Sequence, residues 1–399
     1  MEHQKKIFGL QKNVFFLGLV SLFNDFSSEM IYSVMPVFLT TVLGAPPVLV
    51  GLLEGFADAL ASFLKIYFGW FSDLIRQRKI LSVIGYFISV STRWFLAGVG
   101  NFWDVFLLRA VDRVGKGLRD SPRDALISES VEFSNLGRSF GYHRAMDAIG
   151  SMLGPLAAVI ILPLIFNDYR LLFKFGFIIG FIAIILFIFV KDVKHHPLKN
   201  EKKISKHFHF SLRGYSHTFK VYILAVFIFG LGFLPTALML LKSREMGLSD
   251  FSVPLMYFIY STAFVIFAIP AGRLSDKVGE RTVLILGFIA AIISYIIFFF
   301  SSNFLAVTVG FIILGLYSAM TDGVERALAS KLAPFERLAS SQGYLNASVG
   351  ISSLLAGIIG GSIWTYWGSS MAMLYGIIMM IFGLLTFMYL NGFRKEMYN

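Results

Sequence analysis

Ionisable side chains interrupt two apolar segments in the N-terminal half of the chain at helical spacing. The first set comprises Asp25, Ser28, Glu29, Tyr32 and Pro36. The second set has the same spacing and comprises Arg109, Asp112, Arg113, Lys116 and Asp120. Steps of three, four and seven residues place each set on one face of a helix. Carboxylates and basic groups arranged in this way can pair with one another, carry protons or bind a charged ligand.

We expect a charged cluster half-way through the membrane, to which a third segment, 138–162, contributes Arg144 and Asp147. The cluster comprises the acids Asp25, Glu29, Asp112 and Asp147 and the bases Arg109, Arg113 and Arg144, with Asn24 beside them. The acids outnumber the bases by one, and poor solvation disfavours an uncompensated charge. The excess acid is therefore the natural proton carrier. We favour Asp25 or Glu29, because their segment contains no base. A purely structural ion-pair network is the alternative.

Other charged residues in this half are expected to have local roles. Glu54, Asp58 and Lys65 lie one to three turns apart in one segment, and we expect them to pair with one another. Arg119 and Arg123 are predicted to lie at the cytoplasmic mouth.

The elements that must position this cluster are helices that span a membrane. The chain has 399 residues and is 56% hydrophobic and 15% charged, whereas soluble proteins average about 45–50% apolar and about 25% charged residues. Twelve apolar segments are long enough to cross a bilayer. They are 14–42, 48–70, 80–100, 102–125, 138–162, 171–190, 219–241, 252–272, 282–301, 303–325, 339–364 and 370–391. The predicted fold class is therefore an all-α membrane protein. The absence of cysteine excludes disulfides and thiol chemistry.

The distribution of lysine and arginine predicts the orientation in the membrane. The odd-numbered connections hold only Arg170, Lys242 and Arg244, whereas the N-terminus, the tail and the even-numbered connections are rich in both residues. Cytoplasmic loops carry such an excess. We predict a multi-pass protein of the cell inner (cytoplasmic) membrane with both termini in the cytoplasm. Membrane insertion also explains the net charge of +11, so no nucleic-acid partner is expected.

The two halves of the chain resemble each other at a fixed offset. Gly69-x-x-x-Asp73 recurs as Gly272-x-x-x-Asp276, and Gly141-Tyr142 recurs 202 residues later. An even number of segments per half predicts parallel repeats about an axis normal to the membrane. The predicted domains are an N-terminal six-helix bundle 1–190, a basic cytoplasmic linker 191–218 and a C-terminal six-helix bundle 219–399.

The connection after the eighth segment carries a recognisable signature. Residues 272–281 read Gly-Arg-Leu-Ser-Asp-Lys-Val-Gly-Glu-Arg. This resembles the loop motif of the major facilitator superfamily (MFS), and the earlier copy retains part of it. The resemblance implies the MFS fold, with twelve transmembrane helices in two pseudo-symmetric bundles and the first and fourth helices lining a central cavity. It also implies a cytoplasmic gate made by Gly69, Asp73, Arg78, Gly272, Asp276, Lys277 and Arg281.

The fifth segment is similar to the antiporter motif of the same superfamily. The matching residues are Gly141, Gly150, Gly154 and Pro155. This resemblance favours antiport over symport. The second half is much more apolar, and it offers Tyr260, Tyr317 and Asn346 as a candidate wall for an amphipathic organic substrate. Packing among helices or against lipid is the simpler explanation of these aromatic residues.

We therefore predict a proton-coupled secondary transporter that works as a monomer and exports a small organic solute. Uptake by symport stays open. Transport of a metal ion or chelate also stays open, because Asp25, Glu29, Asn24 and His143 could supply ligands. A membrane receptor would need a sensory domain, and all loops but one are too short for one. No nucleophile–base pair or nucleotide loop is visible, so neither an enzyme nor a cofactor is expected.

Overall fold

A computed structural model describes residues 6–75, 77–132, 135–192, 214–245, 251–301, 303–334 and 338–389. In the first half the elements are α1 (Lys12–Tyr32), α2 (Met35–Val37), the π-helical turn η1 (Phe38–Val42), α3 (Pro47–Ile75), α4 (Arg78–Leu96), α5 (Phe102–Glu129), α6 (Leu136–Leu164), α7 (Tyr169–Leu186) and the 3-10 turn η3 (Phe187–Phe189). In the second half they are α8 (His217–Gly232), α9 (Thr236–Glu245), α10 (Ser252–Val278), α11 (Glu280–Phe300), α12 (Phe304–Lys331), α13 (Leu338–Trp367) and α14 (Ser369–Tyr389).

These elements confirm the prediction of an all-α membrane protein. In the described part of the chain, ten helical stretches are long and apolar enough to cross a bilayer. Helices α4 and α5 are not among the ten, although both pack inside the first group of helices. The charged stripe of α5 explains its low apolar character. A short β-hairpin, β1 (Lys6–Ile7) with β2 (Leu10–Gln11), precedes α1 and was not predicted from the sequence.

The first span of each half is a broken helix rather than the continuous one that hydropathy predicts. The break before α2 lies next to Pro36, and the break between α8 and α9 includes Pro235. Proline has no N–H group to donate, so a helix readily bends or ends at such a position. In the second break the Tyr295 hydroxyl lies 2.7 Å from the backbone nitrogen of Leu234 and accepts its hydrogen bond.

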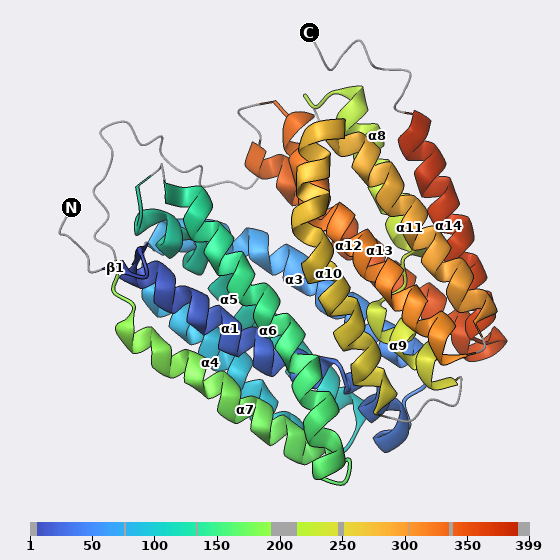
Figure 1. Ribbon diagram of the computed structural model, residues 1–399, viewed down its shortest axis with the longest axis horizontal. Coiled ribbons are helices and arrows are strands. Elements are labelled where there is room, and N and C mark those ends of the chain that lie inside the picture. Colours follow the sequence, from blue (N-terminus) through green and yellow to red (C-terminus); the bar gives the residue numbers. More distant parts are fainter. Residues whose placement is uncertain are drawn as a thin grey trace.

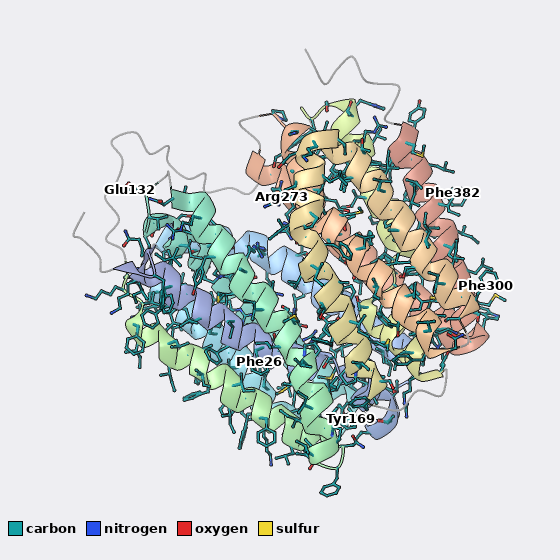
Figure 2. All side chains as sticks on the ribbon, in the orientation of Figure 1. Phe26, Glu132, Tyr169, Arg273, Phe300 and Phe382 are labelled. Atoms are coloured by element: carbon teal, nitrogen blue, oxygen red, sulfur yellow. The ribbon has the colours of Figure 1, made fainter. Side chains whose placement is uncertain are left out.

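The two halves form two helix groups that lie side by side (Figure 1). We call them the N-lobe (α1–α7) and the C-lobe (α8–α14). Matching caps support their internal symmetry: the Asn101 side chain caps α5, and the Asn303 side chain, 202 positions later, caps α12. Phe300 and Phe382 project from the outer face of the C-lobe, as expected of side chains that face lipid (Figure 2). Most of the predicted linker, residues 193–213, falls outside the described residues.

The lobes meet mainly through α3 and α13, where glycines bring the two backbones together. A Cβ atom on Gly51 would lie 2.1 Å from the carbonyl oxygen of Gly357, and one on Gly361 would lie 2.8 Å from the Cα of Val48. We call the end of the molecule at which α3 begins the distal end, and the end that carries Lys12 and Tyr389 the terminal end. The closest contacts between the lobes thus start at the distal end.

Hydrogen bonds between described residues of the two lobes reach from the distal end to the middle of the bundle. The backbone nitrogen of Val48 donates to Thr365 at 3.1 Å. Further in, the Ser353 hydroxyl donates to Asp58 at 2.9 Å. Beyond this level α3 exposes Phe63 and Tyr67, whose side chains are 48% and 54% accessible. The structure is therefore closed at the distal end, while α3 exposes Phe63 and Tyr67 nearer the terminal end.

Candidate functional site

Arg109 holds the acidic groups of two helices together at the centre of the N-lobe. Its guanidinium lies 3.0 Å from the Glu54 carboxylate of α3 and 3.7 Å from Asp112, one turn further along α5. Arg113 closes the other side of Asp112 at 2.6 Å. The expectation that Glu54 pairs within its own helix is therefore wrong, because the fold brings Arg109 of α5 closer. Asp112 and Glu54 are locked into ion pairs and are poor candidates for a proton carrier.

Arg93 and Arg119 converge on one neutral side chain of α1. Arg93 is buried and donates to Asn24 at 2.7 Å and to Ser27 at 2.6 Å. Arg119 donates to the same Asn24 oxygen at 2.8 Å, and its guanidinium lies 4.6 Å from the centre of the Tyr86 ring. The prediction that Arg119 lies at the mouth of the cavity is thus wrong. Its side chain reaches inward to α1, which residue spacing along α5 alone does not reveal.

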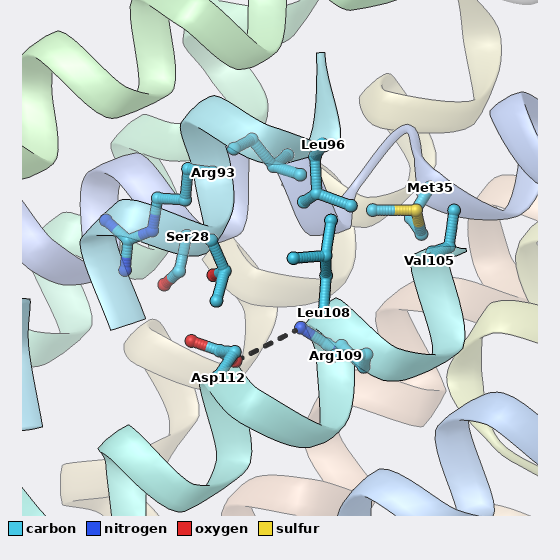
Figure 3. Close-up of a pocket in the computed structure, with 10 residues that line it drawn as sticks. Ser28, Met35, Arg93, Leu96, Val105, Leu108, Arg109 and Asp112 are labelled. Carbon is cyan, nitrogen blue, oxygen red and sulfur yellow. Dashed lines mark ion pairs between the residues drawn. The ribbon is translucent and has the colours of Figure 1, made fainter. Parts of the chain in front are cut away.

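A small cavity lies between α1, α4 and α5, beside these arginines (Figure 3). Ser28, Thr92, Arg93, Arg109 and Asp112 form its polar part. Its volume of about 20 Å³ has room for roughly one water molecule. A water there would have polar partners on several sides, but the cavity is too small for an organic solute.

Asp25 and Glu29, the favoured proton carriers, receive hydrogen bonds from neutral groups. The Asn24 side-chain amide donates to Asp25 at 2.8 Å. The Tyr257 hydroxyl of α10 donates to Glu29 at 2.7 Å, across the interface between the lobes. In the part of the chain that the structure describes, neither carboxylate forms an ion pair. Both lie on the α1 face predicted from the spacing, and Glu29 has a partner in the other lobe that the sequence did not predict.

Asp147 and Arg144 of α6 occupy the edge of the cluster. Asp147 lies 3.5 Å from His143 and 3.7 Å from Arg144, but the Arg144 side chain is 59% exposed. The second carboxylate oxygen of Asp147 is buried and has no hydrogen-bond partner among the described residues. Arg144 therefore compensates Asp147 only weakly and does not reach the central set that the sequence predicted.

The glycines of the antiporter-like motif bring α6 against α1. A Cβ atom on Gly150 would lie 2.5 Å from the backbone oxygen of Leu22, and one on Gly154 would lie 2.6 Å from the backbone nitrogen of Met30. Gly141 has open space around it, whereas Pro155 is buried inside α6. Close packing explains Gly150 and Gly154 and fixes the position of Asp25 and Glu29.

Two residues of the predicted gate, Arg78 and Arg281, have partners within their own lobe. Arg78 donates to Ser72 at 2.6 Å. Arg281 donates to the backbone oxygen of Met388 at 3.1 Å, at the end of α14. Asp276 and Lys277 are exposed, and Gly272 has open space around it. The side-chain surroundings of Gly69 and Asp73 lie outside the described residues, so a gate at this position stays a prediction.

The predicted aromatic wall forms part of a larger set of rings in the C-lobe. Tyr260 shares a hydrogen bond with Ser318 at 2.9 Å, and its ring stacks on Tyr257 at 5.7 Å between centres. Tyr317 is buried against Phe233, with ring centres 4.8 Å apart. Asn346 is half-buried in α13. The predicted residues thus do not share one set of contacts, and Tyr257 connects the wall to the N-lobe.

The metal alternative finds no geometric support among the described residues. They contain no group of three or more histidine and carboxylate side chains that could hold a metal ion. The suggested ligands also have hydrogen-bond partners: His143 shares a hydrogen bond with Ser21 at 2.8 Å, and the Asn24 oxygen accepts from two arginines.

Comparison with known proteins assigns this architecture to a family. The model of the Major Facilitator Superfamily matches residues 17–257 and again 222–397. The chain belongs to the major facilitator superfamily. It is 31% identical over 379 residues to an uncharacterised MFS-type transporter of Methanocaldococcus jannaschii, covering 93% of both chains.

Two further comparisons concern a stretch of the sequence and the fold. It is 31% identical over 103 residues, or 26% of each chain, to the class H tetracycline resistance protein of Pasteurella multocida. Its fold is similar to that of a POT family transporter in complex with 5-aminolevulinic acid, with a TM-score of 0.81, 13% identity and 99% of both chains covered. The protein is a multi-pass membrane transporter of the MFS type and not an enzyme.

Proposed function

We propose that this MFS transporter exports a small organic solute in exchange for protons. Asp25 and Glu29 of α1 are the carboxylates at which the proton and the solute compete. The observation that carries the proposal is their bonding: both accept hydrogen bonds from neutral groups, while Asp112 and Glu54 are locked to arginines. A carboxylate that is not locked into an ion pair in a poorly solvated place can gain and lose a proton as its access to water changes.

The arrangement of the lobes supports alternating access around these two carboxylates. The lobes are bonded from the distal end to the middle, and α3 exposes Phe63 and Tyr67 nearer the terminal end. The excess of lysine and arginine near the termini supports a cytoplasmic terminal end and insertion in the inner membrane. On this orientation the structure faces inward, and a solute would enter from the cytoplasm.

Export is the direction that two observations favour. The chain shares a stretch of sequence with a protein named for tetracycline resistance. Gly150 and Gly154, which resemble the antiporter motif, set the contact between α6 and the helix that carries the two carboxylates. A proton entering down its gradient at Asp25 or Glu29 would drive the solute outward.

The test is proton movement in proteoliposomes that contain the purified protein and a pH-sensitive dye. Organic cations, organic anions and metal ions are added singly under an imposed pH gradient. We expect one organic class to evoke proton movement and the Asp25→Asn and Glu29→Gln variants to lose it. The matched control is Asp322→Asn, which removes a carboxylate that is 56% exposed on α12 and should leave transport unchanged.

The same assay can contradict the proposal in two ways. Solute transport that proceeds without proton movement would exclude proton coupling. Proton movement that survives in both the Asp25→Asn and the Glu29→Gln variant would exclude these carboxylates as the carriers and leave only a structural role for them.

A further inference from the structure

Glu29 lies beside three tyrosines, one from the N-lobe and two from the C-lobe. The ring of Tyr32, one turn after Glu29 on α1, lies 5.4 Å from the ring of Tyr257. Tyr260, one turn further along α10, lies 5.7 Å from Tyr257 on the other side. We call Tyr32, Tyr257 and Tyr260 the tyrosine cluster. A carboxylate beside several aromatic faces is a typical site for an organic ammonium group, because both attract positive charge.

A cation of the protein itself already uses this cluster. The Arg109 guanidinium lies 4.9 Å from the centre of the Tyr32 ring. Its position shows that the Tyr32 ring attracts a planar cation in this structure. Arg109 remains bound to Glu54, however, so it leaves Glu29 to Tyr257.

We propose that Glu29 and the tyrosine cluster form a binding site for an organic ammonium cation, in which the Tyr257 hydroxyl occupies the place of the ligand. The inference rests on the proposed function and specifies its substrate class. In the distal-closed structure Tyr257 donates to the carboxylate. An arriving cation takes over this carboxylate and releases Tyr257, which removes one of the bonds between the lobes.

This replacement would couple binding to the movement of the lobes. A hydrogen bond to a charged group is stronger than one between neutral groups. Ionised, empty Glu29 therefore holds the lobes together at their centre through Tyr257. A proton weakens this bond and a bound cation replaces it, so either one frees the distal end to open. The empty, ionised carrier therefore stays closed at the distal end.

Other charged and titratable groups also act on Glu29. Helices α6 and α7 present Gly154 and Gly176 to this part of α1. The groups that interact electrostatically with Glu29 are Asp25 and Tyr32 of α1, Arg109 and Lys116 of α5, and Tyr257 and Tyr260 of α10. Glu54 and Asp58 of α3 act on the adjoining Tyr32. The pH dependence of binding must therefore be assigned with Glu29 variants rather than from the pH profile alone.

The experiment measures binding by calorimetry to the detergent-purified full chain. The probes are choline, benzyltrimethylammonium and the carbon isostere of choline, in which a tert-butyl group replaces the trimethylammonium group. We expect both cations to bind and the isostere to bind at least about tenfold more weakly. Affinity for the cations should fall as the pH is lowered, because protons compete, and Glu29→Gln should abolish both the binding and its pH dependence.

The decisive variant is Tyr257→Phe, which keeps the ring and removes the competing hydroxyl. We expect it to bind the cations about tenfold more tightly, since a hydrogen bond to a charged group no longer has to be broken. A tyrosine with a merely structural role would give weaker or unchanged binding. Tyr260→Phe is the matched control, because the Tyr260 hydroxyl bonds to Ser318 within the C-lobe, and it should change affinity less than twofold.

A second control separates competition at Glu29 from loosening of the lobes. Ser353→Ala removes the other central hydrogen bond between the lobes, which ends on Asp58. It should not tighten cation binding. The proposed site would be overturned if Ser353→Ala increased the affinity for the cations as much as Tyr257→Phe does. It would also be overturned if choline and its isostere bound with equal affinity. Because binding is measured without a gradient, the site can stand if proton exchange fails, and exchange can stand if the cations do not bind.

Discussion

The two lobes share one fold but stabilise their interiors with different chemistry. The N-lobe interior contains ion pairs such as Arg109–Glu54 and Arg113–Asp112. The C-lobe interior mostly uses neutral hydrogen bonds: Tyr222 donates to the backbone oxygen of Glu325 at 2.9 Å, and Ser294 donates to that of Gly310 at 2.9 Å. Its buried Lys242, 3.5 Å from Glu245, is an exception. Because the C-lobe builds the same fold mostly with neutral bonds, the larger set of charges in the N-lobe points to a role beyond holding six helices together.

This difference predicts which lobe is sensitive to the loss of a single partner. A buried ion pair contributes little net stability, but a charge left without its partner is very unfavourable. The protein loses much less stability when one partner of a neutral hydrogen bond is removed. Substitutions at matched depths in the two lobes therefore test the comparison directly.

Arg109→Ala should have the largest effect. It would leave Glu54 without its ion-pair partner and remove one of two arginines from Asp112. We expect a loss of about 3–5 kcal/mol in the free energy of unfolding, measured by denaturant titration in detergent. Restoring stability with the double variant Arg109→Ala, Glu54→Gln would confirm the cause. A loss below about 1 kcal/mol would show that water already solvates these carboxylates.

Gly357→Ala should be next, because it acts where the lobes touch. The added methyl group would meet the carbonyl oxygen of Gly51 at 2.1 Å, so the backbones must separate. Overpacking of this kind costs about 1–3 kcal/mol. We expect a lower stability of the distal-closed state, seen as a longer distance between spin labels at the distal ends of the lobes. Gly137→Ala, at an exposed position with open space, is the control and should leave that distance unchanged.

Asn24→Ala tests the neutral side chain of the N-lobe that two buried arginines share as an acceptor. Its side-chain oxygen accepts from both Arg93 and Arg119. Removing it leaves two buried donors without this acceptor, and we expect a loss of about 1–3 kcal/mol in thermal or denaturant unfolding. Asn24→Asp should instead retain stability, because a carboxylate can accept the same bonds. If the stability of the Asn24→Ala variant were unchanged, both arginines would have to donate to water in place of the amide oxygen.

The sequence predicts the helices of both lobes better than the contacts between them. Hydropathy identifies the spans, and residue spacing correctly places Asp25 and Glu29 on one face of α1. It cannot show that Arg119 reaches Asn24 or that Glu54 meets Arg109, because such contacts depend on the rotation of each helix against its neighbours. The Glu29–Tyr257 bond joins residues 228 positions apart, and no local pattern specifies it. The breaks at Pro36 and Pro235 carried a local signal, the proline itself, that average hydropathy hides.

Tyr295→Phe measures a neutral bond in the C-lobe. The tyrosine hydroxyl accepts a hydrogen bond from the backbone nitrogen of Leu234 at the break between α8 and α9. We expect a loss of about 1 kcal/mol, smaller than for either Arg109→Ala or Asn24→Ala. The measurement is the same denaturant titration. A loss as large as that of Arg109→Ala would contradict the contrast between the lobes.

Arg326→Ala should have the smallest effect, although it breaks an ion pair as short as those of the N-lobe. Arg326 lies 2.8 Å from Asp322, but the two side chains are 44% and 56% exposed. Exposed pairs contribute about 0–1 kcal/mol because water and salt screen them, so we expect a change below about 0.5 kcal/mol in the titration. Added salt should not alter that difference measurably. If Arg326→Ala destabilised the protein as much as Arg109→Ala, burial would not decide how much an ion pair contributes to stability. The proposed difference between the charged N-lobe and the C-lobe would then be wrong.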